Sequence, residues 1–294
     1  MVSEEAHYCI ERAVKIMGWG EKGIIRIPVD DNYKMRHDLL ETYLKKAEDE
    51  GIRVLGVAGS APTTSTGIHD NLTEIGLFCQ KHDLWFHVDA AHGGPAVFSD
   101  KYKHLMEGCQ RADSIVVDAH KMMMVPSLTT LLFFARQDDS YKTFLQKAQY
   151  LWSGSEKEWY NYGKRTLECT KIMLSTRVYA LMQSYGVEAF AENVHRCYDS
   201  AAFLANEIKK RPEFELATYP ESNIVCFRVV TGDTEYNNAL NKNIRQKMLA
   251  SGHFYIVQTL LKGNVFLRVS IMNPFTTRDD MTEMLEEVVR FSKG

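Results

Sequence analysis

The chain has 294 residues, of which 45% are hydrophobic and 25% charged, so it is long enough for one large and one small domain, each with its own core. Its 35 basic and 38 acidic side chains give a formal net charge of −3, so no basic excess indicates nucleic acid or an anionic membrane as a partner. Its six cysteines have neither metal-site nor disulfide-framework spacing, and we therefore expect reduced thiols in a cytoplasm and no metal.

Neither the N-terminal segment nor the longest apolar stretch of the sequence indicates a membrane protein. Residues 1–17 are acidic and amphipathic, without the apolar region of a signal peptide. The longest apolar stretch, Met122–Ala135, contains Pro126 and is too short to span a bilayer. We therefore expect a soluble protein.

The first predicted element is a helix that starts at Ser3 and stops at Gly18. Ser3 is a suitable N-cap, acidic residues follow it, and apolar residues recur at helical spacing up to Met17. His7 lies one turn into this helix, where an imidazole is usually a half-buried surface residue.

Strands and helices alternate through the next hundred residues. Strands are predicted at 24–29, 54–58, 84–88 and 114–118, and helices at 36–50 and 70–81, the last capped by Asp70. This α/β alternation predicts a mostly parallel sheet with right-handed crossovers and helices on both faces.

Two of these strands end on polar side chains that suit a particular cofactor. One runs into Asp89-Ala90-Ala91-His92-Gly93-Gly94, and the other into Asp118-Ala119-His120-Lys121. Taken singly, such an aspartate is most often a turn or cap residue and such a lysine is usually solvated. Ligands, however, bind at the carboxyl ends of strands in open α/β sheets. A fixed anion and a nucleophilic amine together suit pyridoxal phosphate, whose aldehyde forms a Schiff base with lysine while its ring nitrogen faces a carboxylate.

The second half of the chain differs in composition. Residues 136–165 are polar and aromatic, and a long segment of this type tends to be functional or mobile. Further on, a strand at 129–134, helices at 165–185 and 187–211, strands at 224–230, 254–258 and 265–270, and helices at 235–251 and 277–292 are predicted. We expect residues 1–186 to form part of a large cofactor-binding domain, and residues 187–294 a small α+β domain with its linking helix.

The two strand-end motifs, together with Ser3-Glu4-Glu5-Ala6-His7 and Phe266-Leu267-Arg268-Val269, carry a family resemblance. They resemble the group II pyridoxal-phosphate-dependent amino-acid decarboxylases, which include glutamate, cysteine-sulfinate, aspartate, diaminobutyrate and aromatic-amino-acid decarboxylases. The resemblance implies the fold type I architecture of aspartate aminotransferase, carboxy-lyase activity on an amino acid, pyridoxal 5'-phosphate as the cofactor, and a homodimer.

The resemblance also implies roles for the cofactor-binding residues. Lys121 would carry the Schiff base, and Asp89 would hold the ring nitrogen in its protonated form. His7 would stack on one face of the ring and Ala91 would pack on the other. His120 would contact the cofactor or shuttle a proton.

Three further residues take roles from the same resemblance. Ser60 takes the place of a cofactor-contacting threonine in the hydroxyl-rich loop 59–67, where Pro62 replaces a glycine of the family pattern. Tyr150 corresponds to a tyrosine on a closing loop that protonates the carbanion, although any of four nearby aromatic residues could instead simply pack the loop. Arg268 would bind the substrate carboxylate through its planar fork, whereas a lone strand arginine is usually an exposed residue.

One family feature lies upstream of this sequence. The glycine- and serine-rich loop that binds the cofactor phosphate precedes the His7 motif, and we expect this chain to lack it. Decarboxylation, with an acidic substrate favoured, is thus one hypothesis. The alternative is a non-catalytic remnant, or one part of a split enzyme whose partner chain supplies the missing segment. Transamination is a third hypothesis, which the tyrosine of the closing loop disfavours.

Overall fold

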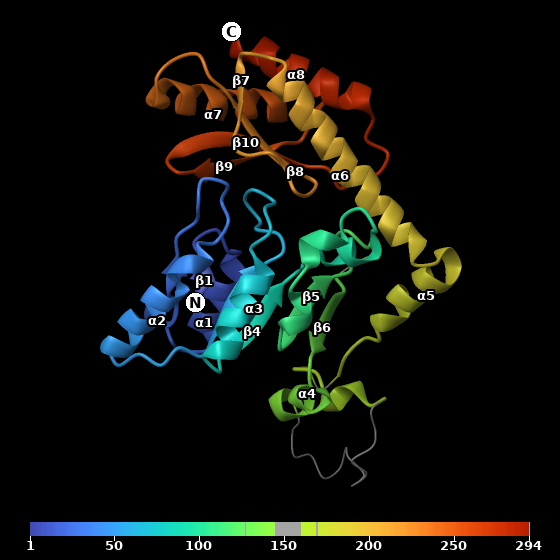
Figure 1. The fold of residues 1–294 in the computed structure, drawn as a ribbon. Coiled ribbons are helices and arrows are strands. Elements are labelled where there is room, and N and C mark those ends of the chain that lie inside the picture. The colour runs from blue at the N-terminus through green and yellow to red at the C-terminus, as the bar shows by residue number, and fades with distance from the viewer. Residues whose placement is uncertain (127, 145–159, 169, 294) are drawn as a thin grey trace.

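The computed structural model describes residues 1–126, 128–144, 160–168 and 170–293, and these form two sheets (Figure 1). The larger sheet has the strand order β2-β1-β3-β4-β5-β6, and the smaller has the order β7-β8-β10-β9. Helix α6 (Glu188–Lys209) leads from the region of the larger sheet to the smaller sheet. It contacts β7 and β8 of the smaller sheet and the turn Gly94–Phe98 that follows β4. No helix in the described part of the chain is long and apolar enough to cross a membrane.

The larger sheet is mostly parallel, as predicted. Its strands are β1 (Val2–Ser3), β2 (Arg26–Ile27), β3 (Gly56–Ser60), β4 (Trp85–Asp89), β5 (Ser114–Asp118) and β6 (Thr130–Phe134). All neighbouring pairs run parallel except β5 and β6, which are antiparallel. The alternation of apolar strands with helices thus predicted the architecture correctly.

Helix α3 (Leu72–Lys81) packs directly on one face of this sheet, whereas the other face borders a cavity. The helices are α1 (Tyr8–Ile16), α2 (Leu40–Asp49) and α3 (Leu72–Lys81). Helix α3 packs closely enough that a Cβ at Gly59 would lie 3.1 Å from Leu72 and 3.3 Å from Ile75. On the other face Trp85 and His87 are half-buried and line, with α1, a cavity of about 850 Å³.

The smaller sheet is antiparallel and packs two helices on one face. Its strands are β7 (Phe214–Leu216), β8 (Ile224–Val229), β9 (Val257–Leu261) and β10 (Asn264–Ser270), and its helices are α7 (Thr234–Ser251) and α8 (Arg278–Ser292). Side chains alternate along β8, so Val225 and Phe227 join the core under the helices. Ile224 and Cys226 point the other way and pack with Tyr33 of the larger-sheet region.

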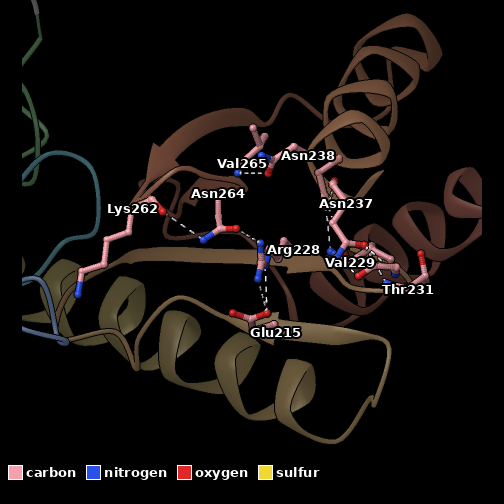
Figure 2. Close-up of polar contacts among 11 residues, drawn as sticks. Glu215, Arg228, Val229, Thr231, Asn237, Asn238, Lys262, Asn264 and Val265 are labelled. Carbon is pink, nitrogen blue, oxygen red and sulfur yellow. Dashed lines mark hydrogen bonds and ion pairs between the residues drawn. The ribbon is translucent and has the colours of Figure 1, made fainter. Parts of the chain in front are cut away.

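Asparagine side chains of α7 tie this helix to the smaller sheet (Figure 2). Asn237 accepts hydrogen bonds from the amides of the turn after β8, and Asn238 accepts one from Val265 at 2.7 Å. Asn241 is fully buried, accepts from the amide of Val229 at 2.9 Å and donates to its carbonyl at 2.8 Å. One side chain thereby satisfies both backbone polar groups of a buried strand residue.

Replacing Asn241 with alanine should lower the free energy of unfolding by about 2–4 kcal/mol, because both backbone groups of Val229 would lose their partner inside the core. Asn243→Ala is the matched control, since Asn243 lies on the same helix but is exposed, and it should cost less than about 0.5 kcal/mol. Chemical denaturation of both variants measures the difference. Equal losses would show that the Asn241 contacts do not stabilise the fold.

Two helix starts differ from the prediction. The first helix begins at Tyr8 with His7 as its N-cap, because Ser3 instead pairs with Ile27 in the parallel β1–β2 ladder. Helix α5 begins at Ser175 and ends at Tyr185, so the predicted helix from residue 165 is ten residues too long at its start. A helix that was not predicted, α4 (Gln137–Phe144), follows β6.

Candidate active site

Three neighbouring parallel strands end on polar residues at one edge of the larger sheet. Ser60 of β3 lies opposite Asp89 of β4, and Asp89 lies opposite Val116, two positions before Asp118 of β5. Because strand side chains alternate, Ser60, Asp89 and Asp118 all leave the same face of the sheet. The predicted meeting of the two motifs at one sheet edge therefore occurs.

Lys121 reaches this edge through the turn that follows β5. Its Nζ lies 2.8 Å from Oδ2 of Asp118, and the other carboxylate oxygen accepts from the hydroxyl of Thr130 at 2.6 Å. Partial burial would raise the pKa of Asp118, but the hydrogen bonds from Lys121 and Thr130 outweigh burial and hold it below the usual value. Asp118 orients the lysine amine, a role that the sequence analysis did not assign to it.

Asp89 is held by the turn that it begins. Its Oδ1 accepts from the amide of Ala91 at 3.2 Å, and the carbonyl of Ala91 accepts from the amide of Asp118 at 3.0 Å. Oδ2 of Asp89 has no hydrogen-bond partner among the described residues. One carboxylate oxygen is thus fixed and the other remains available to a ligand.

His7 lies near Asp89 and Lys121, at the start of α1. Its Nδ1 accepts from the amide of Cys9 at 3.3 Å, and its ring centroid lies 4.1 Å from that of Tyr8. Burial lowers the pKa of His7, and the charges of Asp89 and Lys121 act on it in opposite directions. The three side chains therefore belong to one electrostatic cluster, although they come from three separate segments.

His120 is anchored by backbone groups. Its Nδ1 lies 3.0 Å from the carbonyl oxygen of Thr129 and 3.1 Å from the amide nitrogen of the same residue. These two contacts fix the position of the ring. Nε2 lies 3.9 Å from Oδ2 of Asp118.

Ser60 is buried, and its hydroxyl oxygen has no hydrogen-bond partner within the described part of the chain. Its backbone is fixed by Asp70, whose Oδ2 accepts from the amide of Ser60 at 2.8 Å while Oδ1 accepts from Met35. The prediction that Asp70 caps α3 is wrong, because Asn71 is the N-cap. Burial raises the pKa of Asp70 to about 6.

Arg268 extends from β10 to the loop that follows β3. Its Nε and Nη2 donate to the carbonyl of Thr64 at 3.0 and 2.6 Å, and Nε also lies 3.1 Å from the carbonyl of Ser65. Nη1 has no acceptor among the residues that the structure describes. Tyr150, the predicted proton donor, lies outside those residues.

A second link between the smaller sheet and this loop was not predicted. Glu221, just before β8, accepts from the amide of His69 at 2.8 Å and pairs with Lys34 at 2.8 Å. Partial burial raises the pKa of Glu221, but the contacts with His69 and Lys34 outweigh burial and lower it to about 2.

These contacts make part of the stability depend on pH. The pKa of Glu221 falls from 4.5 to about 2 on folding, so its stabilising contribution is complete above pH 4.5 and disappears as the pH falls toward 2. The shift corresponds to about 3 kcal/mol. The difference in unfolding free energy between the wild type and Glu221→Gln should therefore shrink between pH 5 and pH 3. Denaturation at several pH values measures this difference. A difference that stays constant with pH would contradict the lowered pKa of Glu221.

Comparison with protein families identifies this arrangement. Residues 1–230 match the family model described as the pyridoxal-dependent decarboxylase conserved domain. The chain belongs to this family. Its mostly parallel sheet and its small antiparallel sheet are those of a pyridoxal-dependent decarboxylase of fold type I, as the sequence predicted.

Two similar proteins are also named as decarboxylases. The acidic amino acid decarboxylase GADL1 of Mus musculus is 31% identical over 301 residues, which cover 97% of this chain and 54% of the relative. The aspartate 1-decarboxylase of Aliivibrio fischeri is 28% identical over 309 residues, covering 97% and 56%. The crystal structure of mouse CSAD in its apo form superposes with a TM-score of 0.91 at 25% identity, covering 99% of this chain and 63% of that one. The chain thus spans less than two thirds of each of these relatives.

Proposed function

We propose that this protein binds pyridoxal 5'-phosphate at the carboxyl edge of the larger sheet and decarboxylates an L-amino acid. The observation that carries this proposal is that two adjacent parallel strands bring a lysine and an aspartate to one sheet edge. The amine of Lys121 is held by Asp118, and Oδ2 of Asp89 has no hydrogen-bond partner among the described residues. Membership of the pyridoxal-dependent decarboxylase family supports it.

The residues present fit the cofactor. Lys121 offers the primary amine that an aldehyde requires, and Oδ2 of Asp89 offers an anion to a protonated ring nitrogen. The buried hydroxyl of Ser60 has no partner in the described part of the chain, and such burial is costly unless a ligand supplies one. His7 would stack on the ring, and the small side chain of Ala91 would leave room for its other face.

When bound, the cofactor supplies an electron sink for the bond that breaks as carbon dioxide leaves. Asp89 would keep the ring nitrogen protonated, and Asp118 orients Nζ of Lys121. His120 lies beside this pair, with Nε2 3.9 Å from the Asp118 carboxylate, and would contact the cofactor or shuttle a proton there. Tyr150 would deliver the final proton to the substrate carbon.

We infer that the substrate is an acidic amino acid. Two of the relatives are named for such substrates, the acidic amino acid decarboxylase GADL1 and the aspartate 1-decarboxylase. Arg268 would bind the substrate carboxylate through Nη1, which the loop carbonyls leave free within the described residues. Its other two nitrogens would keep the guanidinium in a fixed orientation.

A substrate panel tests both parts of this proposal. Carbon dioxide release is measured with added cofactor and L-aspartate, L-glutamate, L-cysteine sulfinate, L-2,4-diaminobutyrate or L-tyrosine. Acidic substrates should turn over fastest, and Arg268→Ala should raise their KM by about tenfold or more through the lost ion pair. Lys262→Ala is the matched control, since Lys262 also extends from the smaller sheet to a backbone carbonyl, that of Asp30. Release from none of the acidic substrates would overturn the substrate class, and an unchanged KM in Arg268→Ala would overturn its role.

Further proposals concern the organisation of the chain. Helix α5 ends at Tyr185 and α6 begins at Glu188, which supports a division between a large domain, 1–186, and a small one, 187–294. The exposed side chains of Ile16, Met17 and Trp19 support association, as a homodimer or with another chain. Light scattering would measure the assembly.

The five described cysteines are unpaired, which supports a cytoplasmic location.

A further inference from the structure

His92 connects the turn after Asp89 to the smaller sheet. Its Nε2 lies 2.7 Å from Oδ1 of Asn223, a residue that is fully buried just before β8. Asn223 is itself fixed, because its Nδ2 donates to the carbonyl of Ile271 at 3.0 Å and its own carbonyl accepts from the amide of Ile271. The bond from Nδ2 determines which end of the Asn223 side-chain amide faces the imidazole, and the backbone bond fixes the residue itself.

The protonation of His92 follows from this geometry. Since Oδ1 of Asn223 can only accept, Nε2 of His92 must be the donor. Burial lowers the pKa of His92 to about 4, so the ring is neutral at pH 7 and its single proton lies on Nε2. The smaller sheet thus selects one tautomer and one orientation of this ring.

The turn that carries His92 is packed without spare room. The amide of Gly93 donates to the carbonyl of Ala61 at 3.1 Å. A Cβ at Gly93 would lie 2.6 Å from Cδ of Pro62 and 3.0 Å from Nε2 of His69. A shift of His92 would therefore be passed along the turn, whose other end holds Asp89 through the amide of Ala91.

We propose that His92 is a positioning residue through which Asn223 of the smaller sheet fixes the Asp89 carboxylate in the geometry that the cofactor requires. Its role in catalysis rests on the proposed function, whereas the mechanical link exists in the cofactor-free protein. The donor on Nε2, rather than the bulk of the ring, carries the link.

Two substitutions separate the donor from the bulk of the side chain. His92→Gln keeps an N–H donor at nearly the same distance from the backbone, whereas His92→Leu fills space without a donor. In the cofactor-free protein, amide hydrogen exchange at Ala91 reports directly on its bond to Asp89. His92→Leu should accelerate this exchange about tenfold, and His92→Gln should leave it within about threefold of the wild type. The amide of Val229, bonded to Asn241 in the smaller sheet, is the control and should be unchanged in both variants.

A cofactor titration followed by near-visible absorbance extends the test to function. The dissociation constant should rise about tenfold in His92→Leu and stay near the wild-type value in His92→Gln. Nitrogen chemical shifts of the wild-type imidazole give a readout that needs no variant, and Nε2 should carry the proton. A proton on Nδ1, or unchanged Ala91 exchange in a folded His92→Leu, would overturn the proposal. A wild type that binds no cofactor, but with the predicted exchange pattern, would overturn the proposed function and leave the link standing.

Discussion

Replacing Lys121 with alanine should abolish the near-visible absorbance of the cofactor-loaded protein and lower carbon dioxide release by roughly 10⁴-fold or more, because the chain loses its covalent attachment point. The side chain is partly exposed and its one ion pair among the described residues is with Asp118, so its removal should leave the fold intact. Absorbance, turnover and circular dichroism of the same preparation measure the three quantities together.

The chain provides a closely matched control for this experiment. Lys103 forms an ion pair with Asp100 at 2.6 Å, with the same spacing of three residues as Lys121 and Asp118, but neither residue belongs to the two strand-end motifs. Lys103→Ala should keep both the absorbance and the turnover. Wild-type turnover in Lys121→Ala would assign the chemistry to another residue.

Asp89→Asn should lower kcat by about 10²–10³-fold, the size of effect expected when a preorganised charge is removed from a reacting group. The asparagine Oδ1 can still accept from the amide of Ala91, so the turn should keep its shape. What changes is Oδ2, which becomes an uncharged amide group and no longer favours a protonated ring nitrogen. The loss should therefore appear in kcat more than in protein stability.

Asp113→Asn is the control for this substitution. Asp113 also accepts a backbone hydrogen bond in the same sheet, from the amide of Phe86 at 2.8 Å, but it precedes β5 and lies at the opposite sheet edge. Its asparagine variant should retain full turnover. Equal losses in the two variants would mean that the charge of Asp89 has no special part in the reaction.

The parts of this site that could be predicted from the sequence depend on local patterns. Short apolar runs indicated β4 and β5, and the rule that ligands bind at strand carboxyl ends placed Asp89 and Lys121 at one edge. The start of the first helix was missed because the partner of Ser3, Ile27, lies 24 positions further along the chain. N-cap preferences concern only the residues next to the helix and do not predict such a long-range strand pairing.

The contacts that hold the site depend on residues far apart in the sequence. Asp70 meets the amide of Met35 across 35 positions, and His92 meets Asn223 across 131. Arg268 reaches the carbonyl of Thr64 across 204 positions. No local pattern predicts these contacts, so only the folded arrangement of the two sheets shows them.

The measurement that tests the central claim most directly is borohydride reduction of the protein with pyridoxal 5'-phosphate, followed by peptide mapping. The proposal predicts a single reduced adduct on the peptide that contains Lys121, with no adduct on the peptide that contains Lys103. An adduct on a different lysine, or none at saturating cofactor, would contradict the assignment of Lys121 as the cofactor-binding residue of this chain.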